Sequence, residues 1–99
     1  MLTANDIIHF LTENKTYLKN NFYCSEIGLL GSFARNEQTD ESDIDILVVF
    51  EPGTPNLYYV ELELKGYLKK CFNREVDICS KKWIRPVFKP LILKEAIYA

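Results

Sequence analysis

The stretch DIDILVVF, residues 43–50, decides how this chain folds, because it carries the strongest strand signal in the sequence. It opens with acidic and apolar residues in strict alternation and ends as a continuous apolar run, the pattern of a strand entering a covered sheet. Side chains alternate between the two faces of a strand, so Asp43 and Asp45 share one face while Ile44 and Ile46 face apolar packing on the other. The stretch therefore predicts a strand with a polar start and a buried end.

Helices and further strands are expected to alternate around this stretch. Thr3 is expected to cap a first helix, with Asp6 in its first turn. The pattern predicts helices over residues 3–20, from 54–56 to 71 and from about 90 onwards, strands over 24–30 and 75–79, a helical turn over 33–36 and a loop over 37–42. This order implies a small α/β (α+β) domain with helices packed on a sheet.

Apolar residues at helical spacing predict two packed surfaces in the second half of the chain. Gly66 lies within the first and costs a helix about 1 kcal/mol relative to alanine, so close packing is expected there. The first surface is a core-facing stripe made of Leu57, Val60, Leu64, Leu68 and Cys71. The second is broken by Pro86 and Pro90 and is made of Trp83, Val87, Phe88, Leu91, Ile92 and Ala96.

Composition places the chain among ordinary globular proteins. With 12 Lys and Arg against 14 Asp and Glu, its net charge of −2 argues against direct nucleic-acid binding, which usually needs a basic excess. A hydrophobic content of 47% argues against long disorder, and 99 residues suit one domain over 1–99. No signal peptide or membrane span is expected, and three cysteines without a CxxC pair indicate neither a disulfide frame nor a zinc site. A cytoplasmic location is therefore expected.

Asp43 and Asp45 are the first candidates for chemistry. Two carboxylates held close together repel each other at neutral pH, so they need a shared cation or a raised pKa to coexist. A hard divalent cation such as Mg²⁺ supplies this, because it prefers oxygen ligands and accompanies phosphate substrates. Taken alone, such a pair is more often two solvated residues at the start of a strand.

Two further features extend the candidate site. Gly31-Ser32 follows a predicted strand, and the free N–H groups of this turn and the Ser32 hydroxyl can bind phosphate oxygens, although Gly-Ser is also a common turn. Asp77 can join the carboxylate pair if the two strands are neighbours, and is otherwise a half-exposed strand residue. Together the three features suit two-metal phosphoryl or nucleotidyl transfer, in which cations about 3.5–4 Å apart hold the attacking and leaving oxygens.

The same residues carry a family resemblance. Gly31-Ser32-Phe33-Ala34-Arg35, followed by SDIDILV at residues 42–48, resembles the GSxAR…SDxDxxV signature of the DNA polymerase β-like nucleotidyltransferase superfamily. More narrowly, the chain is similar over essentially its whole length to the minimal nucleotidyltransferases. Asp77 falls where that family has its third carboxylate, and the ending PLILKEAIYA at 90–99 is similar to its terminal helix. The resemblance implies the polymerase β-like fold, a small mixed sheet with helices packed on it.

The resemblance also implies roles for individual residues. Gly31 and Ser32 would hold the triphosphate of ATP, the substrate, while the carboxylates of Asp43, Asp45 and Asp77 would be catalytic. Asp43 and Asp45 would bind two Mg²⁺ ions, and Asp77 would complete the site of the metal that activates the attacking hydroxyl. Arg35 would either approach a phosphate or form a salt bridge to the acidic loop.

Two neighbouring positions add detail to this comparison. Ser42 is expected to orient Asp43 or to cap the loop rather than to touch substrate. Asn36 stands where the family usually has glycine after the arginine. Because asparagine tolerates left-handed backbone, the turn is expected to survive.

Many minimal nucleotidyltransferases that resemble this chain are antitoxins. They transfer AMP from ATP to a tyrosine of a HEPN-family ribonuclease toxin, and the resemblance implies the same Mg²⁺-dependent AMPylation and a toxin partner here. Two alternatives stay open: a binding module that neutralises its partner by occlusion, and a nucleotidyltransferase that acts on a small molecule. A chain this short has little material to wall a pocket, so a homodimer is one way to complete the site.

Overall fold

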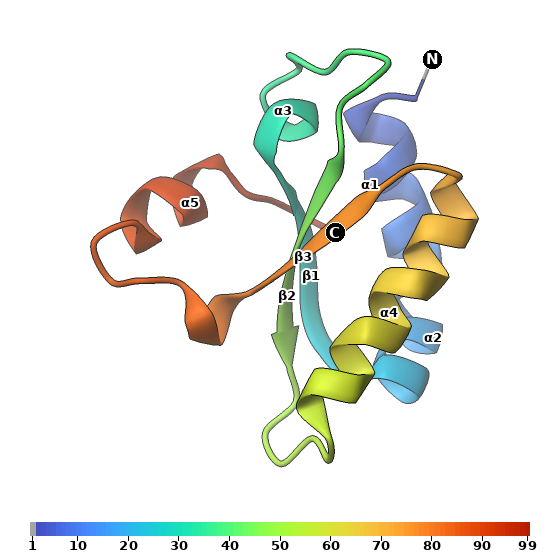
Figure 1. The fold of residues 1–99 in the computed structure, drawn as a ribbon, viewed down its shortest axis with the longest axis vertical. Helices are drawn as coiled ribbons and strands as arrows, with labels where there is room; N and C mark the ends of the chain where they lie inside the picture. Colours follow the sequence, from blue (N-terminus) through green and yellow to red (C-terminus); the bar gives the residue numbers. More distant parts are fainter. Residues whose placement is uncertain (1) are drawn as a thin grey trace.

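The computed structural model describes residues 2–99 and arranges them as helices and strands that largely alternate (Figure 1). The elements are α1 (Ala4–Glu13), α2 (Lys15–Phe22), β1 (Cys24–Leu30), α3 (Gly31–Ala34), β2 (Ile44–Phe50), α4 (Leu57–Phe72), β3 (Val76–Ser80), the 3₁₀ turn η1 (Lys81–Trp83), α5 (Lys89–Glu95) and β4 (Ile97–Tyr98). Within this described part, none of the helices combines the length and apolarity needed to cross a bilayer.

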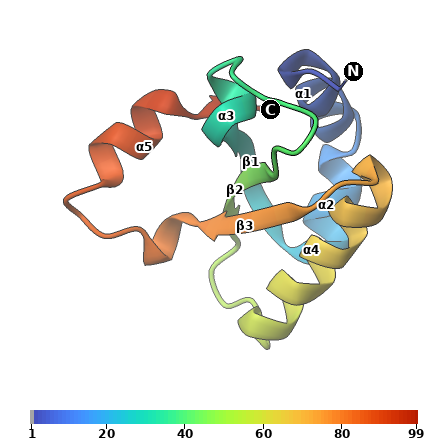
Figure 2. The same ribbon diagram turned by 45° about the horizontal axis from the view of Figure 1, so that its top comes forward.

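The four strands form one mixed sheet in the order β3-β2-β1-β4. β2 runs parallel to β3 and antiparallel to β1, and β4 pairs antiparallel with the other edge of β1. Helices α1, α2 and α4 cover one face of this sheet, and α5 stands off on the other side (Figures 1 and 2). The prediction of a small mixed sheet with helices packed on it is confirmed.

The core lies between the sheet and the three covering helices. Ile44 and Ile46 of β2 are fully buried on this face, as their alternation with the aspartates predicts. They belong to one apolar cluster with buried residues of the helices, namely Ile7, Leu11, Leu18, Val60, Leu64 and Leu68. Burial of this cluster fixes which face of β2 points inward, and so sends Asp45 to the opposite face.

The predicted helix over residues 3–20 is wrong in one respect, because the chain breaks it at Asn14 into α1 and α2. The Asn14 backbone leaves helical geometry (φ −105°, ψ 13°), and its side-chain amide donates to the Phe10 carbonyl at 2.8 Å. Such a side-chain bond competes with the helical ladder and lets the second helix take a new direction. The cap at the start is confirmed, since Thr3 and Asp6 form a reciprocal capping box.

In α4 the predicted stripe is confirmed at its centre and wrong at Cys71. Val60, Leu64 and Leu68 are buried, whereas Cys71 is exposed. Gly66 lies on the solvent side of the helix, and a Cβ added there would meet nothing within 4 Å. The expected close packing at Gly66 is therefore absent from the described residues.

The end of the chain departs most from the sequence-based expectation. The predicted terminal helix stops at Glu95, and Ile97 and Tyr98 instead form β4, which pairs with Leu29 and Gly28 of β1. A Cβ on Gly28 would lie 2.8 Å from the Ile97 carbonyl oxygen, so the missing side chain is what lets β4 approach.

The apolar residues before β4 were expected to pack helically, and this expectation is wrong for most of them. The exposed ones are Trp83, Val87, Phe88 and Leu91, and α5 contains no buried residue.

Candidate functional site

The candidate site begins where β1 ends and α3 begins. Gly31 has a φ of +72°, in the left-handed region that favours glycine. The carboxylate of Asp45 also fills the space that a side chain at this position would need. Gly31 is thus required twice, once for the turn and once for the close approach of β2.

Asp45 and Asp77 are brought together by the parallel pairing of β2 with β3. The two residues are direct partners in the register, so their side chains leave the same face of the sheet, opposite the buried Ile44 and Ile46. Asp45 is half-buried, and its pKa is raised first by burial, then by the charges of Asp77 and Asp43. The structure therefore brings the predicted carboxylates within electrostatic reach of one another.

Asp43 and Asp77 are more open to solvent than Asp45. Asp43 lies just before the first residue of β2 and is exposed. The Asp77 side chain is 63% exposed, and one of its oxygens lies 3.8 Å from the ammonium nitrogen of Lys65 on α4. Both carboxylates are accessible to a molecule that approaches from solution.

A network of hydrogen bonds shapes the loop that leads to Asp43. The Ser42 hydroxyl accepts a hydrogen bond from the Thr39 N–H at 2.8 Å. Ser42 therefore caps the loop, which is one of its two predicted roles. Arg74 donates to the Thr39 and Ser42 carbonyls at 3.1 and 2.8 Å, and its guanidinium lies over the Phe33 ring of α3. Arg74 thereby ties the Asp43 loop to the turn that follows Gly31.

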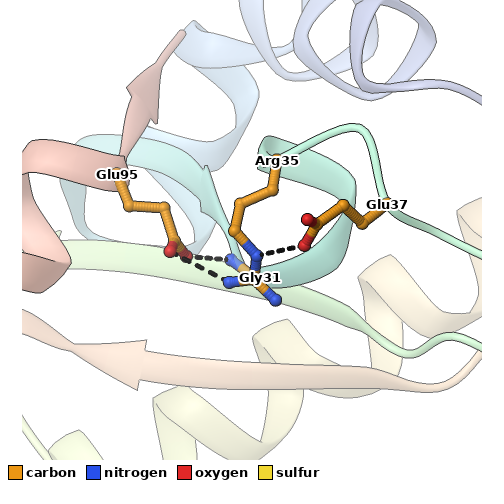
Figure 3. Close-up of polar contacts among 4 residues, drawn as sticks. All are labelled: Gly31, Arg35, Glu37 and Glu95. Atoms are coloured by element: carbon orange, nitrogen blue, oxygen red, sulfur yellow. Dashed lines mark hydrogen bonds and ion pairs between the residues drawn. The ribbon is translucent and has the colours of Figure 1, made fainter.

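Arg35 is held by carboxylates from two directions (Figure 3). Its Nε donates to Glu37 at 2.8 Å, which is the predicted salt bridge to the acidic loop, and its Nη1 donates to Glu95 at 2.9 Å. The other Glu95 oxygen accepts the Gly31 N–H at 2.7 Å. Sequence reasoning missed Glu95, although it is the only acidic residue among residues 81–99, a segment rich in lysine and apolar residues.

The remaining residues of the turn leave donors for a ligand. The first N–H groups of a helix have no partner within that helix, which leaves those of Ser32 and Phe33 without one inside α3. Among residues 2–99 the Ser32 hydroxyl makes no hydrogen bond. Asn36 adopts a φ of +60°, so the left-handed conformation expected at this position is confirmed.

The donor chemistry of the site suits a hard divalent cation, although the side chains are not drawn together around one point. Among residues 2–99 no three His, Cys, Asp or Glu side chains are grouped closely enough to hold a metal ion together. The oxygens of Asp43, Asp45 and Asp77 are nevertheless the ligand type that Mg²⁺ prefers. Burial raises the pKa of Asp45 most, and a cation would relieve the repulsion from Asp77 and Asp43 that raises it further. The assignment of these three residues as metal ligands stays a prediction.

The sequence has close relatives among known proteins. It is 37% identical over 98 residues to protein adenylyltransferase MntA of Thermococcus cleftensis, covering 99% of this chain and 97% of the relative. It is 40% identical over 99 residues to a Methanocaldococcus jannaschii protein whose name gives protein adenylyltransferase as a provisional activity, covering 99% of both chains.

The fold has matching solved structures. A structure described as a minimal nucleotidyltransferase superposes with a TM-score of 0.79 at 28% identity, covering 97% of this chain and 95% of that one. A toxin–antitoxin crystal structure with AMP-PNP superposes with a TM-score of 0.68 at 25% identity, covering 98% of this chain and 72% of that one. The family model of the nucleotidyltransferase domain matches residues 11–99 of the chain. The chain therefore belongs to the nucleotidyltransferase domain family and, within it, to the minimal nucleotidyltransferases.

Proposed function

We propose that this enzyme transfers AMP from ATP to a tyrosine hydroxyl of a partner protein, and that the partner is a HEPN-family ribonuclease toxin which the modification silences. The observation that carries the proposal is the placement of Asp45 beside both Gly31 and Asp77, in a chain 37% identical to protein adenylyltransferase MntA. The toxin–antitoxin structure with AMP-PNP supports an antitoxin role and a nucleotide substrate.

The residues of the site have different roles in the proposed reaction. The Ser32 hydroxyl and the N–H groups of the turn hold the triphosphate oxygens, and Asp43, Asp45 and Asp77 hold Mg²⁺. When bound, Mg²⁺ neutralises charge on the triphosphate and makes the attacking hydroxyl more acidic. The tyrosine oxygen bonds to the α-phosphorus, the bond from that phosphorus to the bridging oxygen breaks, pyrophosphate leaves, and Asp77 accepts the hydroxyl proton.

The openness of Asp77 favours a macromolecular acceptor. Its carboxylate is 63% exposed at an edge strand of the sheet, so a hydroxyl on another protein can reach it without entering an enclosed pocket. A free small molecule would need walls that orient it, and a side chain as exposed as that of Asp77 has little protein around it.

One observation favours a second candidate function, neutralisation of the partner by occlusion alone. Trp83, Val87, Phe88 and Leu91 are all more than half exposed and follow one another in the chain. Exposed apolar residues that gather in one segment often mark a protein–protein interface. In this second reading the nucleotide site regulates the complex instead of modifying the partner.

The test is transfer of label from α-labelled ATP to the proposed HEPN-family toxin partner in the presence of Mg²⁺. We expect Asp45→Asn and Asp77→Asn to reduce labelling by about 100-fold or more. Asp40→Asn is the matched control, since Asp40 is an exposed carboxylate of the preceding loop, and it should label at the wild-type rate. Full labelling by Asp45→Asn would rule out the proposed chemistry, and protection of cells by that variant would favour occlusion.

Loss of activity in Asp45→Asn should not come from unfolding. Because the pKa of Asp45 is raised, the folded state binds this proton more tightly than the unfolded chain does, so the ionised form destabilises the fold at neutral pH. In EDTA at pH 7, Asp45→Asn should therefore be at least as stable to urea as wild type. The difference should shrink as the pH falls through the raised pKa of Asp45, and an Asp45→Asn variant less stable at pH 7 would contradict this account.

A further inference from the structure

The last residue of α5 reaches across to the first residue of α3. Glu95 accepts the Gly31 N–H with Oε1 at 2.7 Å and the Arg35 guanidinium with Oε2 at 2.9 Å, so both oxygens of one carboxylate are engaged (Figure 3). The Glu95 side chain is only 29% exposed. Hydrogen bonds to an ionised carboxylate are the stronger kind, so this contact restrains the turn.

The backbone of the C-terminal strand determines where Glu95 lies. Ile97 pairs with Leu29, and the Ala99 N–H donates to the Ile27 carbonyl at 3.0 Å, which anchors the chain beside the end of β1. No residue of α5 itself is buried. Glu95, two residues before β4, is therefore placed by the sheet and not by packing of its own helix.

The contact divides the donors of the turn between the protein and a ligand. Glu95 takes the N–H of Gly31 and one side of Arg35, while the N–H groups of Ser32 and Phe33 have no partner within α3. The charge of Arg35 is already paired with two carboxylates, those of Glu95 and Glu37.

We infer that Glu95 is a positioning residue for nucleotide binding: its carboxylate holds Gly31 and Arg35 so that the Ser32 side of the turn is presented to the triphosphate. This inference rests on the proposed function. The rival reading is that the carboxylate stands in for a phosphate and must leave before ATP binds. The two readings make opposite predictions for removal of the carboxylate.

The experiment compares Glu95→Ala, Glu95→Gln and Glu37→Gln with wild type. Titration with Mg²⁺ and AMP-PNP measures nucleotide affinity, and the labelling assay separates KM for ATP from kcat. We expect Glu95→Ala to weaken AMP-PNP binding and raise KM by about 10-fold, the scale of one charge-assisted hydrogen bond, with a smaller change in kcat. Glu95→Gln keeps an oxygen for the Gly31 N–H and should recover most of the affinity. Glu37→Gln removes only the charge of the outer partner of Arg35 and should behave as wild type.

The amide resonance of Gly31 in a ¹⁵N–¹H spectrum supplies a readout that needs no catalysis. Glu95→Ala should shift it towards a weaker hydrogen bond, and AMP-PNP should leave it in place in wild type while moving that of Ser32. Unchanged affinity and an unshifted Gly31 amide in a folded Glu95→Ala variant would overturn the inference. Tighter binding by that variant, or release of the Gly31 amide on adding AMP-PNP, would overturn it in favour of the rival reading.

Failure of the proposed function gives a different pattern. A wild-type chain that binds AMP-PNP but labels no protein would contradict AMP transfer, while the binding data would still test Glu95. A wild-type chain that binds no nucleotide would contradict the proposed function. It would also overturn the role of Glu95 in nucleotide binding, whatever the Gly31 amide shows. If Glu95→Ala does not fold, Glu95→Gln carries the test: a small rise in KM and a small shift of the Gly31 amide are then expected, and AMP-PNP binding tighter than that of wild type would overturn the inference in favour of the rival reading.

Discussion

Helices α4 and α5 look alike in sequence and behave differently in the fold. Both carry apolar residues at helical spacing, and in α4 Leu64 and Leu68 are fully buried against the sheet. In α5 no residue is buried, and Leu91 is 70% exposed. Periodicity therefore indicates which residues share a helix face, but it does not indicate whether another surface covers that face.

The two faces of the sheet explain the difference. α4 lies on the face that presents Ile44 and Ile46, together with the apolar residues of α1 and α2. α5 belongs to the C-terminal segment, residues 81–99, which begins where β3 ends and stands apart from the three covering helices (Figure 2). This segment has five basic residues and one acidic residue, so it would carry charge into any packed interface.

The comparison predicts its largest effect for matched leucine truncations. Leu64→Ala removes a fully buried side chain and should lower the free energy of unfolding by about 3 kcal/mol, because it loses apolar burial and leaves a cavity. Leu91→Ala removes a side chain that is 70% exposed and should change it by less than about 0.5 kcal/mol. Urea denaturation of the two variants measures the difference.

Equal losses in the two variants would break the comparison, since they would mean that α5 packs on the body in solution. A loss in Leu91→Ala that appears only at high protein concentration would instead point to self-association through the exposed residues. Repeating the urea titration over a tenfold range of concentration separates these outcomes.

A second prediction concerns the only strand of the C-terminal segment. Gly28→Ala places a Cβ 2.8 Å from the Ile97 carbonyl oxygen, and its nearest neighbours are backbone atoms of Ile97 and Tyr98, which cannot yield as a flexible side chain would. We expect a loss of about 2 kcal/mol, the range of an overpacked site, together with loosening of β4. Trypsin should then cut after Lys94 faster in Gly28→Ala than in Leu91→Ala. Equal cutting rates would show that β4 tolerates the extra methyl group.

Local patterns in the sequence were sufficient for β2 and for the turn at Gly31. Alternation places Asp45 opposite the buried isoleucines, and only glycine suits both the positive φ and the contact with that carboxylate. Thr3 and Asp6 likewise form their cap from neighbouring residues, without help from the rest of the fold. Such features are predictable because each is determined within a few residues.

Features that join distant segments left no comparable signal. The contact of Glu95 with Gly31 spans 64 positions, and it depends on a two-residue strand too short to show any alternation. The sequence predicts Asp77 near Asp45 only if their two strands pair. The strands do pair, in parallel, and this pairing needs a crossover connection, which α4 provides between β2 and β3. The break at Asn14 depends on one side-chain bond that competes with helix.

The smallest predicted effect tests the outer surface of α4 against its buried face. Gly66 sits inside the helix on the exposed side, has an ordinary helical backbone, and a Cβ there would touch nothing within 4 Å. Gly66→Ala should therefore stabilise the protein by about 0.5–1 kcal/mol, because alanine loses less backbone freedom on folding and no neighbour has to move. A modest rise in the urea midpoint with unchanged slope is the expected result. A destabilised Gly66→Ala variant would show that another surface packs on this side of α4. The contrast between a buried and an open face of α4 would then be wrong.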